Sequence, residues 1–319
     1  METTTTGHPS PTTDAATDVD GGAGYVHGYT DREARRLGEQ AHVLAELLHG
    51  GTRYPAGARV LEVGCGVGAQ TLHLIDGSPG ADLTAVDVSA ESLARARARV
   101  AAERPGAPVT WVRADLHDLP FADAEFDHLF VCFVLEHLPD PVAALAGLRR
   151  VLRPGGTLTV IEGDHASAFF HPDSAAARTA IGHLIALQAA AGGDGLIGRR
   201  LYPLLDAAGY QRVAVGPRTV YADASRPALV QGFVHDTFTA MVGSVREEAL
   251  AAGLTTPQEW QRGIDGLRRT AAPDGTFHYT FFKATAVNPP AVNPPAGGPP
   301  AGGPATGQAP RTSGSTSRA

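Results

Sequence analysis

The sequence is poor in cysteine and has no long apolar run. Cys65 and Cys132 are the only cysteines among 319 residues, which excludes a disulfide framework and a zinc site built on several thiolates. No apolar stretch approaches the roughly 20 residues that a helix needs to cross a bilayer. Residues 1–20 also lack a basic region followed by an apolar one, so we expect no secretory signal. These absences predict a cytoplasmic protein without a membrane segment.

Positive charge is scarce as well. The chain has 26 lysine and arginine residues against 33 aspartate and glutamate residues, which gives a net charge of -7, and Lys283 is its only lysine. Proteins that bind nucleic acid usually present a basic surface, which this composition does not favour. We therefore expect neither DNA nor RNA as a substrate.

The two ends of the chain differ from its middle. Residues 1–22 are rich in threonine and glycine, and residues 287–319 repeat proline and glycine without apolar periodicity. Segments of such composition cannot bury enough apolar surface to offset the entropy lost on folding. We therefore predict disordered ends and one folded domain over residues 23–286.

Short apolar runs alternate with helical patterns inside this domain. The strand-like runs cover residues 59–66, 82–89, 108–116, 126–135 and 157–163. This alternation predicts an α/β fold, a doubly wound and mostly parallel sheet with helices on both faces. Two further helical stretches, near residues 170–198 and 226–270, interrupt the rhythm. We expect them to form a helical cap inserted around the last strands.

A glycine-rich turn follows the first strand. Gly64, Gly66 and Gly68 are spaced G-x-G-x-G, one residue tighter than the G-x-G-x-x-G of dinucleotide-binding turns. Ligands of open α/β sheets bind beyond the C-terminal ends of the strands, where this turn lies. Glu62, inside the strand, would repel a pyrophosphate and would suit a ligand with a cationic end, such as an ammonium group.

Acidic residues at the ends of the next two strands extend this site. Asp87 lies 19 residues after Gly68, where a carboxylate can accept hydrogen bonds from both hydroxyls of a ribose. Asp115 ends the third strand and is placed to accept from an exocyclic amine such as adenine N6, with Leu116 and Phe121 flanking the base. The implied ligand is an adenosine joined to a group that carries an ammonium.

Five segments occur in an order and at a spacing typical of one family: LEVGCGVG, AVDVS, ADLHDLPF, FDHLFVCFVLEHLPDP and LRRVLRPGGTLTV. The chain resembles the class I, Rossmann-like S-adenosylmethionine-dependent methyltransferases of the small-molecule type, closely over residues 55–165 and loosely beyond. The resemblance implies a seven-stranded sheet with an antiparallel last strand, for which residues 275–286 are the candidate. It also implies S-adenosyl-L-methionine as the cofactor. The residues expected to contact the cofactor are Tyr25, Glu62, Gly64, Gly66, Gly68, Gln70, Asp87, Val88, Asp115, Leu116, Cys132 and Phe133.

A catalytic base would have to lie near the transferred methyl group, just beyond the fourth and fifth strands. The segment VIEGDHASAFFHPDS follows the fifth strand, and we predict Glu162 or His165 as this base. In an alternative interpretation, Asp164, His165, His171 and Asp173 bind a divalent metal that orients an oxygenated acceptor. In a third, the acids of this loop only cap the next helix.

The acceptor is expected to be a small molecule held in a closed pocket under the added helices. In similar methyltransferases an N-terminal segment often folds over the cofactor, and here that segment carries Tyr25 and Tyr29. The residues expected to contact the acceptor are Tyr29, His171, Arg200, Tyr202, His235 and Phe238. A homodimer is compatible with the sequence.

The leading hypothesis for function is transfer of a methyl group to a secondary metabolite, by O- or C-methylation. One alternative is C-methylation of an isoprenoid diphosphate with Mg²⁺, for which Arg199 and Arg200 would clamp the diphosphate. A second alternative is a protein that binds S-adenosylmethionine without transferring its methyl group.

Overall fold

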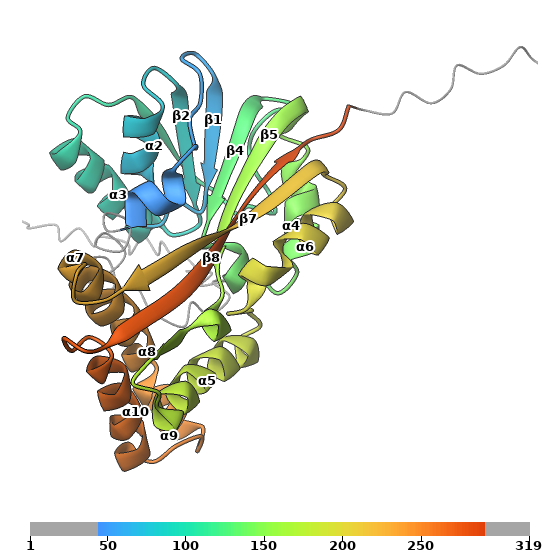
Figure 1. Ribbon diagram of the computed structural model, residues 1–319. Helices are drawn as coiled ribbons and strands as arrows, with labels where there is room; N and C mark the ends of the chain where they lie inside the picture. Colours follow the sequence, from blue (N-terminus) through green and yellow to red (C-terminus); the bar gives the residue numbers. More distant parts are fainter. Residues whose placement is uncertain (1–43, 291–319) are drawn as a thin grey trace, which may run out of the picture. The chain divides into compact units, whose positions relative to one another are not determined.

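A mixed β-sheet runs through the part of the chain that the computed structural model describes, residues 44–290 (Figure 1). Seven of its eight strands follow the order β3-β2-β1-β4-β5-β8-β6. β5 and β6 pair with different halves of β8, and β7 pairs with β8 along nearly its whole length. The strands are β1 (Arg59–Val63), β2 (Asp82–Asp87), β3 (Val109–Arg113), β4 (Phe126–Cys132), β5 (Leu152–Gly163), β6 (Phe169–His171), β7 (Gln211–Ala222) and β8 (Thr276–Val287). Residues 1–22 and most of 287–319, for which we predict disorder, lie outside the described residues.

The direction of the strands matches the sequence-based expectation. β1 to β5 run parallel to one another, and β8 runs antiparallel to β5, β6 and β7. The predicted α/β fold with an antiparallel last strand is therefore confirmed. The predicted count of seven strands is one short, because β6 adds three residues to the sheet beside β8. A strand of three residues is too short to show an apolar alternation, so its sequence looks like a loop.

Helices cover both faces of the parallel strands. α2 (Thr71–Gly77) and α3 (Ala90–Glu103) lie on one face, and α4 (Pro141–Leu148) and α6 (Leu201–Ala207) lie on the other (Figure 1). Successive residues of one strand point to opposite faces. Leu61 and Leu129 therefore join the core under α4 and α6, whereas Val60 and Phe130 join the core on the opposite face.

Local signals fix where these helices begin. Ser89 caps α3 by accepting a hydrogen bond from the backbone of Ser92, and Asp140 caps α4 just before Pro141. The last long helix, α10 (Pro257–Arg269), begins at a capping box formed by Thr256 and Glu259.

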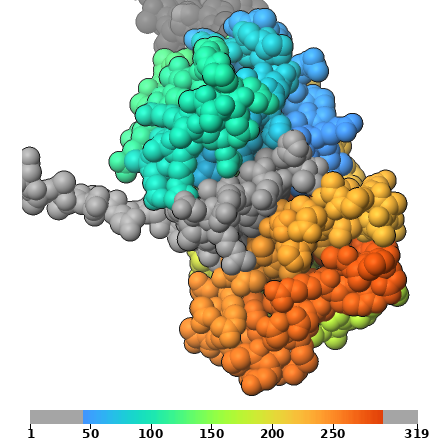
Figure 2. All heavy atoms as spheres, turned by 90° about the vertical axis from the view of Figure 1, so that its left-hand side faces the viewer, coloured from blue at the N-terminus to red at the C-terminus, as the bar shows by residue number. Residues whose placement is uncertain are grey.

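The helices added after β6 and β7 gather beyond one end of the sheet. α5 (Ala175–Ala190) follows β6, and after β7 come α7 (Pro227–Leu229), η4 (Val230–Thr239), α8 (Ala240–Ser244), α9 (Arg246–Ala251) and α10. Figure 2 shows the orange residues of this cap at the opposite end of the visible face from the teal residues of the first strands and helices. Both stretches in which we expected inserted helices contain them. None of the helices among the described residues has the length and apolar character needed to cross a membrane.

The ordered fold extends slightly past the predicted boundary at residue 286. β8 ends at Val287, and the buried side-chain amide of Asn288 donates to the carbonyl oxygens of Leu152 (2.6 Å) and Arg149 (3.0 Å). These bonds hold the end of β8 against the start of β5 and the end of α4.

Candidate active site

The turn after β1 has a backbone that favours glycine. Gly64, Gly66 and Gly68 have φ angles of 71°, 51° and 75°. A Cβ on Gly64 would lie 2.5 Å from the side chain of Val134, and one on Gly68 would lie 2.9 Å from Ala96. A Cβ on Gly66, in contrast, would meet no heavy atom of the described residues within 4 Å. Two of the glycines are thus required by packing, and the third borders open space.

Asp87 fixes this turn from the end of β2. Its Oδ2 accepts a hydrogen bond from the amide of Gly66 (2.8 Å), and its Oδ1 accepts one from the amide of Ser89 (2.9 Å). Burial raises the pKa of the Asp87 carboxyl group. A carboxylate offers about four lone-pair directions, and the backbone amides do not occupy all of them, so Asp87 can still accept from a hydroxyl donor such as that of a ribose.

Glu62 lies behind the turn and is buried. It accepts a hydrogen bond of 2.6 Å from the hydroxyl of Thr71, at the start of α2. Burial, together with the negative charge of Asp87, raises the pKa of Glu62 to about 8. Gln70 is another predicted cofactor contact, and its Oε1 lies 2.6 Å from His49 Nε2. Sequence patterns did not indicate His49, which lies at the end of the helical residues 44–49.

The other predicted cofactor contacts lie at neighbouring strand ends. Val88 follows β2 and is 49% exposed, while Asp115 follows β3, is exposed, and accepts a hydrogen bond from the amide of His117 (2.9 Å). Leu116 is half-buried beside it. Cys132 ends β4 in a buried position, and Phe133 follows it. The adjacency of β1, β2, β3 and β4 thus brings these residues to one edge of the sheet. Tyr25 and Tyr29 lie outside the described residues.

Glu162, a predicted base, is fully buried at the end of β5. Its Oε1 accepts hydrogen bonds from the amides of Val134 (3.0 Å) and Leu135 (2.8 Å). Burial, reinforced by the charge of Glu136, raises the pKa of Glu162 well above its usual range. This carboxyl group therefore connects β5 to the short helix η1 (Leu135–His137). Its role as a base stays a prediction, and its burial favours a positioning role.

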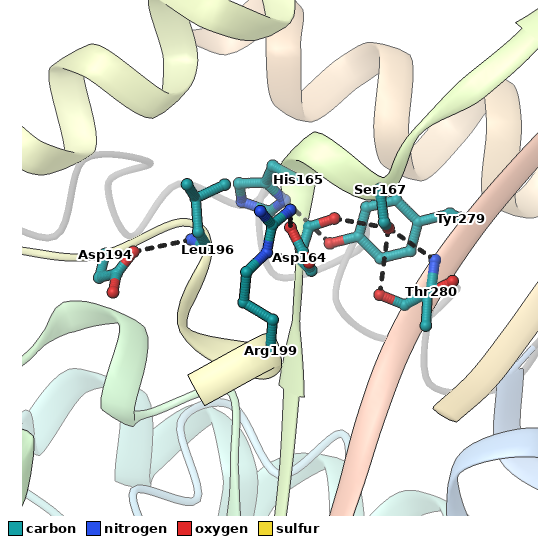
Figure 3. A network of polar contacts seen from close by, with 8 residues as sticks. All are labelled: Asp164, His165, Ser167, Asp194, Leu196, Arg199, Tyr279 and Thr280. Atoms are coloured by element: carbon teal, nitrogen blue, oxygen red, sulfur yellow. Dashed lines mark hydrogen bonds and ion pairs between the residues drawn. The ribbon is translucent and has the colours of Figure 1, made fainter. Parts of the chain in front are cut away.

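His165, the other predicted base, is buried in the helix η2 (His165–Ser167) and contacts Tyr279 of β8 (Figure 3). Its Nδ1 lies 2.9 Å from the Tyr279 hydroxyl oxygen. Burial is the main cause that raises the pKa of Tyr279, so its hydroxyl keeps its proton at neutral pH. Two glycines leave room for His165 and Tyr279. A Cβ on Gly163 would lie 2.4 Å from the Tyr279 oxygen, and one on Gly195 would lie 2.8 Å from His165 Cδ2.

Tyr279 is held in place by an unusual helix. η4 has π-helical hydrogen bonding, and the hydroxyls of Thr237 and Thr239 each donate to the carbonyl oxygen five residues earlier, both at 2.7 Å. A π-helix has more residues per turn than an α-helix, so side chains five apart share a face. Phe233 and Phe238 accordingly both pack on the Tyr279 ring, with centroids 5.6 and 5.4 Å away. Of the predicted acceptor contacts, Phe238 is thus a fully buried part of this aromatic cluster.

The arginines proposed as a diphosphate clamp are both engaged by carboxylates. Arg199 donates two hydrogen bonds of 2.6 and 2.7 Å to the buried Asp164 (Figure 3), and Arg200 donates to Asp194 at 2.5 Å. Within residues 44–290, no group of three or more His, Cys, Asp or Glu side chains is arranged to hold a metal ion. To clamp a diphosphate, Arg199 and Arg200 would have to exchange these carboxylates for the ligand.

The remaining predicted acceptor contacts are dispersed. His171 is exposed at the end of β6, His235 is exposed on η4 and lies 2.8 Å from Asp236, and Tyr202 is 55% exposed on α6. Sequence patterns did not indicate Gln188 and Tyr279, which lie around His165 with Glu136, and the segment that contains Glu136 is typical of the family whatever the substrate. The signals available were the polar LEH after an apolar strand and the lone tyrosine hydroxyl in the aromatic run of β8.

Comparisons with known proteins agree with this geometry. Residues 61–160 match the family model of a methyltransferase domain. The O-methyltransferase cnsE of Penicillium expansum is 36% identical over 169 residues, which cover 49% of this chain and 59% of cnsE. The 27-O-demethylrifamycin SV methyltransferase of Amycolatopsis mediterranei is 33% identical over 134 residues, 42% of this chain and 49% of that protein. The chain therefore spans less than two thirds of the length of these relatives.

A solved structure shares the fold. Phosphoethanolamine N-methyltransferase 2 of Haemonchus contortus, in complex with phosphomonomethylethanolamine and S-adenosylhomocysteine, superposes with a TM-score of 0.51 at 16% identity. The match covers 81% of this chain and 58% of that one. Residues 61–160 therefore match a methyltransferase domain, and the chain shares the fold of this solved methyltransferase.

Proposed function

We propose that this protein transfers the methyl group of S-adenosyl-L-methionine to a small-molecule acceptor, by O- or C-methylation of a secondary metabolite in a pocket under the cap. The observation that carries the proposal is the pairing of Asp87 with Gly66 at the end of β1. The carboxylate holds the turn by one amide and keeps lone pairs for ribose hydroxyls, while Gly66 borders open space among the described residues.

Each part of the cofactor would have a partner in this chain. Asp87 would accept from the ribose hydroxyls, Asp115 would accept from the adenine amine, and the backbone of Gly64 and Gly66 would approach the amino-acid part. When bound, the sulfonium supplies an already activated methyl group. The chain's own residues would therefore align the acceptor, exclude water and take up a proton.

The proposed acceptor class is supported by the relatives and by the charge of the chain. Both relatives described above are named as methyltransferases. One is named an O-methyltransferase, and the other a methyltransferase of 27-O-demethylrifamycin SV. The net charge of -7 supports a small molecule over a nucleic acid. A cytoplasmic location is part of the same proposal.

Titration calorimetry with S-adenosylmethionine tests the cofactor site. We expect Asp87→Asn to weaken binding at least about 10-fold, since a hydrogen bond to a charged group contributes about 1.5–3 kcal/mol. Asp82→Asn is the matched control, because Asp82 is an exposed aspartate at the opposite end of the same strand. Equal affinity of both variants and wild type, or tight binding of a nicotinamide cofactor instead, would overturn the proposed site.

A second experiment tests the transfer itself. The protein is incubated with a metabolite extract and S-adenosylmethionine labelled in its methyl group, and the labelled product is identified by mass spectrometry. We expect one small molecule to gain the label while S-adenosylhomocysteine accumulates. Binding of S-adenosylmethionine without S-adenosylhomocysteine formation in any extract would favour the alternative of a binding protein that transfers no methyl group.

A further inference from the structure

Glu136 occupies a distinctive place beyond the end of β4. It lies in η1, with its Oε1 3.4 Å from His137 Nε2 and its Oε2 3.8 Å from His165 Nε2. Its side chain is 12% exposed. Val134, two residues earlier, is the side chain that packs against Gly64 in the glycine turn. Glu136 therefore lies beside His165 and follows, by two residues, the side chain that packs on the turn assigned to the cofactor.

The two neighbouring acids have protein partners, although the second oxygen of Glu162, Oε2, has none among the described residues. Glu162 is fully buried and accepts hydrogen bonds from two backbone amides. Asp164 is buried and accepts two hydrogen bonds from the guanidinium group of Arg199. Among these three carboxyl groups, Glu136 is the one that combines partial exposure with a position between two imidazoles. Carboxyl groups of one site that differ in burial and in hydrogen-bond partners commonly have different catalytic roles.

Tyr279 orients His165 with respect to Glu136. Burial raises the pKa of Tyr279, so its hydroxyl keeps a proton that it can donate to His165 Nδ1 at 2.9 Å. A neutral imidazole that accepts at Nδ1 carries its hydrogen on Nε2. That nitrogen lies 3.8 Å from Glu136 Oε2, so its hydrogen would point toward the Glu136 carboxyl group.

A second, independent observation indicates that a polar ligand belongs here. Gln188 of α5 is only 2% exposed, and neither atom of its side-chain amide has a hydrogen-bond partner among the described residues. A Cβ on Gly195 would lie within 2.8 Å of both Gln188 Oε1 and His165 Cδ2, so the amide lies beside the imidazole. A buried amide without partners is costly, and native structures usually pair such groups with protein, water or ligand.

We propose that Glu136 is the catalytic base of methyl transfer to a hydroxyl group of the acceptor, and that the Gln188 amide binds a second oxygen of the same acceptor. This proposal rests on the function proposed above. In the step, the hydroxyl oxygen bonds to the methyl carbon, and the electron pair of the S–CH₃ bond remains on sulfur as a thioether. The hydroxyl proton passes to an oxygen of Glu136. His165 and Tyr279 are positioning residues that act through Glu136.

The first test compares Glu136→Gln with His137→Asn, and uses Glu103→Gln as a control on the exposed end of α3. Turnover is followed with methyl-labelled S-adenosylmethionine and the acceptor that the metabolite experiment identifies. We expect Glu136→Gln to lower kcat at least about 100-fold, in the range found for loss of a general base. Cofactor affinity, measured by calorimetry, should stay within about twofold of wild type in all three variants.

The pH profile of kcat separates the base from its neighbours. The titratable groups around Glu136 are His137 on η1, His165 on η2, Glu162 on β5, Cys132 on β4 and Tyr279 on β8. If a carboxylate base takes up the proton, the turnover of wild type should fall toward acidic pH. We expect His137→Asn to keep this acidic limb and Glu136→Gln to lose it. Retention of the limb in Glu136→Gln, or its loss in His137→Asn, would overturn the assignment of the base.

The second test needs no acceptor. Because the Gln188 amide is unpaired in the free protein, we expect Gln188→Met to raise the melting temperature by about 2–4 °C. The same variant should raise KM for the acceptor while leaving cofactor affinity unchanged. A lowered melting temperature would show that Gln188 serves folding and would overturn its assignment to the ligand. A product methylated on carbon or nitrogen would overturn the hydroxyl chemistry but would leave the proposed methyltransferase function intact.

Discussion

Alanine at two glycines of the turn after β1 should separate the stability of the fold from the binding of the cofactor. Gly64 and Gly66 both have positive φ angles, of 71° and 51°. Adding a Cβ in this left-handed region costs roughly 1–2 kcal/mol at each position. The two positions differ in what the new methyl group would meet. At Gly64 it would lie 2.5 Å from a methyl group of Val134, whereas at Gly66 it would lie more than 4 Å from every described heavy atom.

The expected magnitudes follow from this difference. Overpacking a well-packed site typically costs about 1–3 kcal/mol, so Gly64→Ala should lower the free energy of unfolding by roughly 2–5 kcal/mol in total. Gly66→Ala should lower it by only about 1–2 kcal/mol. Its methyl group would instead occupy the space assigned to the cofactor, so S-adenosylmethionine affinity should fall at least about 100-fold, or roughly 2.7 kcal/mol.

Urea denaturation and calorimetry on the same preparations measure both effects. Gly57→Ala is a suitable control, because Gly57 also has a positive φ and open space around it but lies before β1, at its opposite end. It should lose stability as Gly66→Ala does and bind S-adenosylmethionine as wild type does. Wild-type affinity in Gly66→Ala would refute the reasoning, because no ligand could then lie against that glycine.

Three further substitutions probe buried polar groups. Burial raises the folded-state pKa of Glu62 to about 8. The protonated Glu62 side chain therefore stabilises the fold fully below pH about 4.5, and this stabilisation, up to about 5 kcal/mol, is lost as the pH rises to 8. Glu62→Gln should flatten this part of the curve of unfolding free energy against pH. Lys283 is buried and donates to the carbonyl oxygens of Leu48 (3.1 Å) and Gly50 (2.9 Å). Lys283→Met should therefore lower the free energy of unfolding by about 2–4 kcal/mol in urea denaturation. An unchanged free energy of unfolding would show that these carbonyls find other donors. Tyr279→Phe should lower kcat without changing cofactor affinity, and a parallel loss of both would assign Tyr279 to folding alone.

The glycine turn and the neighbouring strand ends could be predicted because their requirements are local. A turn with three positive φ angles within five residues demands glycine, and the demand appears directly as G-x-G-x-G. The ends of parallel strands meet at one edge of the sheet, so Asp87 and Asp115 could be placed beside this turn without coordinates. Long apolar runs, such as that of β4, likewise indicate strands buried on both faces.

The residues that we propose for the acceptor side could not be predicted from the sequence, because they come together only in the folded chain. Glu136, His165, Gln188 and Tyr279 come from η1, η2, α5 and β8, and each has an ordinary local explanation in its own segment. The loop acids also look alike in sequence. The Arg199 pairing of Asp164 and the backbone hydrogen bonds of Glu162 distinguish them only after folding. The same holds for the arginines, which look free for a ligand until their carboxylate partners are known.

The π-helix η4 connects the helical cap to Tyr279 and His165. An α-helix turns about 100° per residue, so Phe233 and Phe238 would point in directions about 140° apart if η4 were α-helical. Only one of them could then contact Tyr279, whereas both do so here. The cap would therefore set the position of the Tyr279 hydroxyl, and through it the orientation of His165. If this coupling is correct, removing one residue from η4 to restore α-helical spacing should impair turnover more than cofactor binding. Equal effects on both would show that the π-helix serves only the packing of the cap.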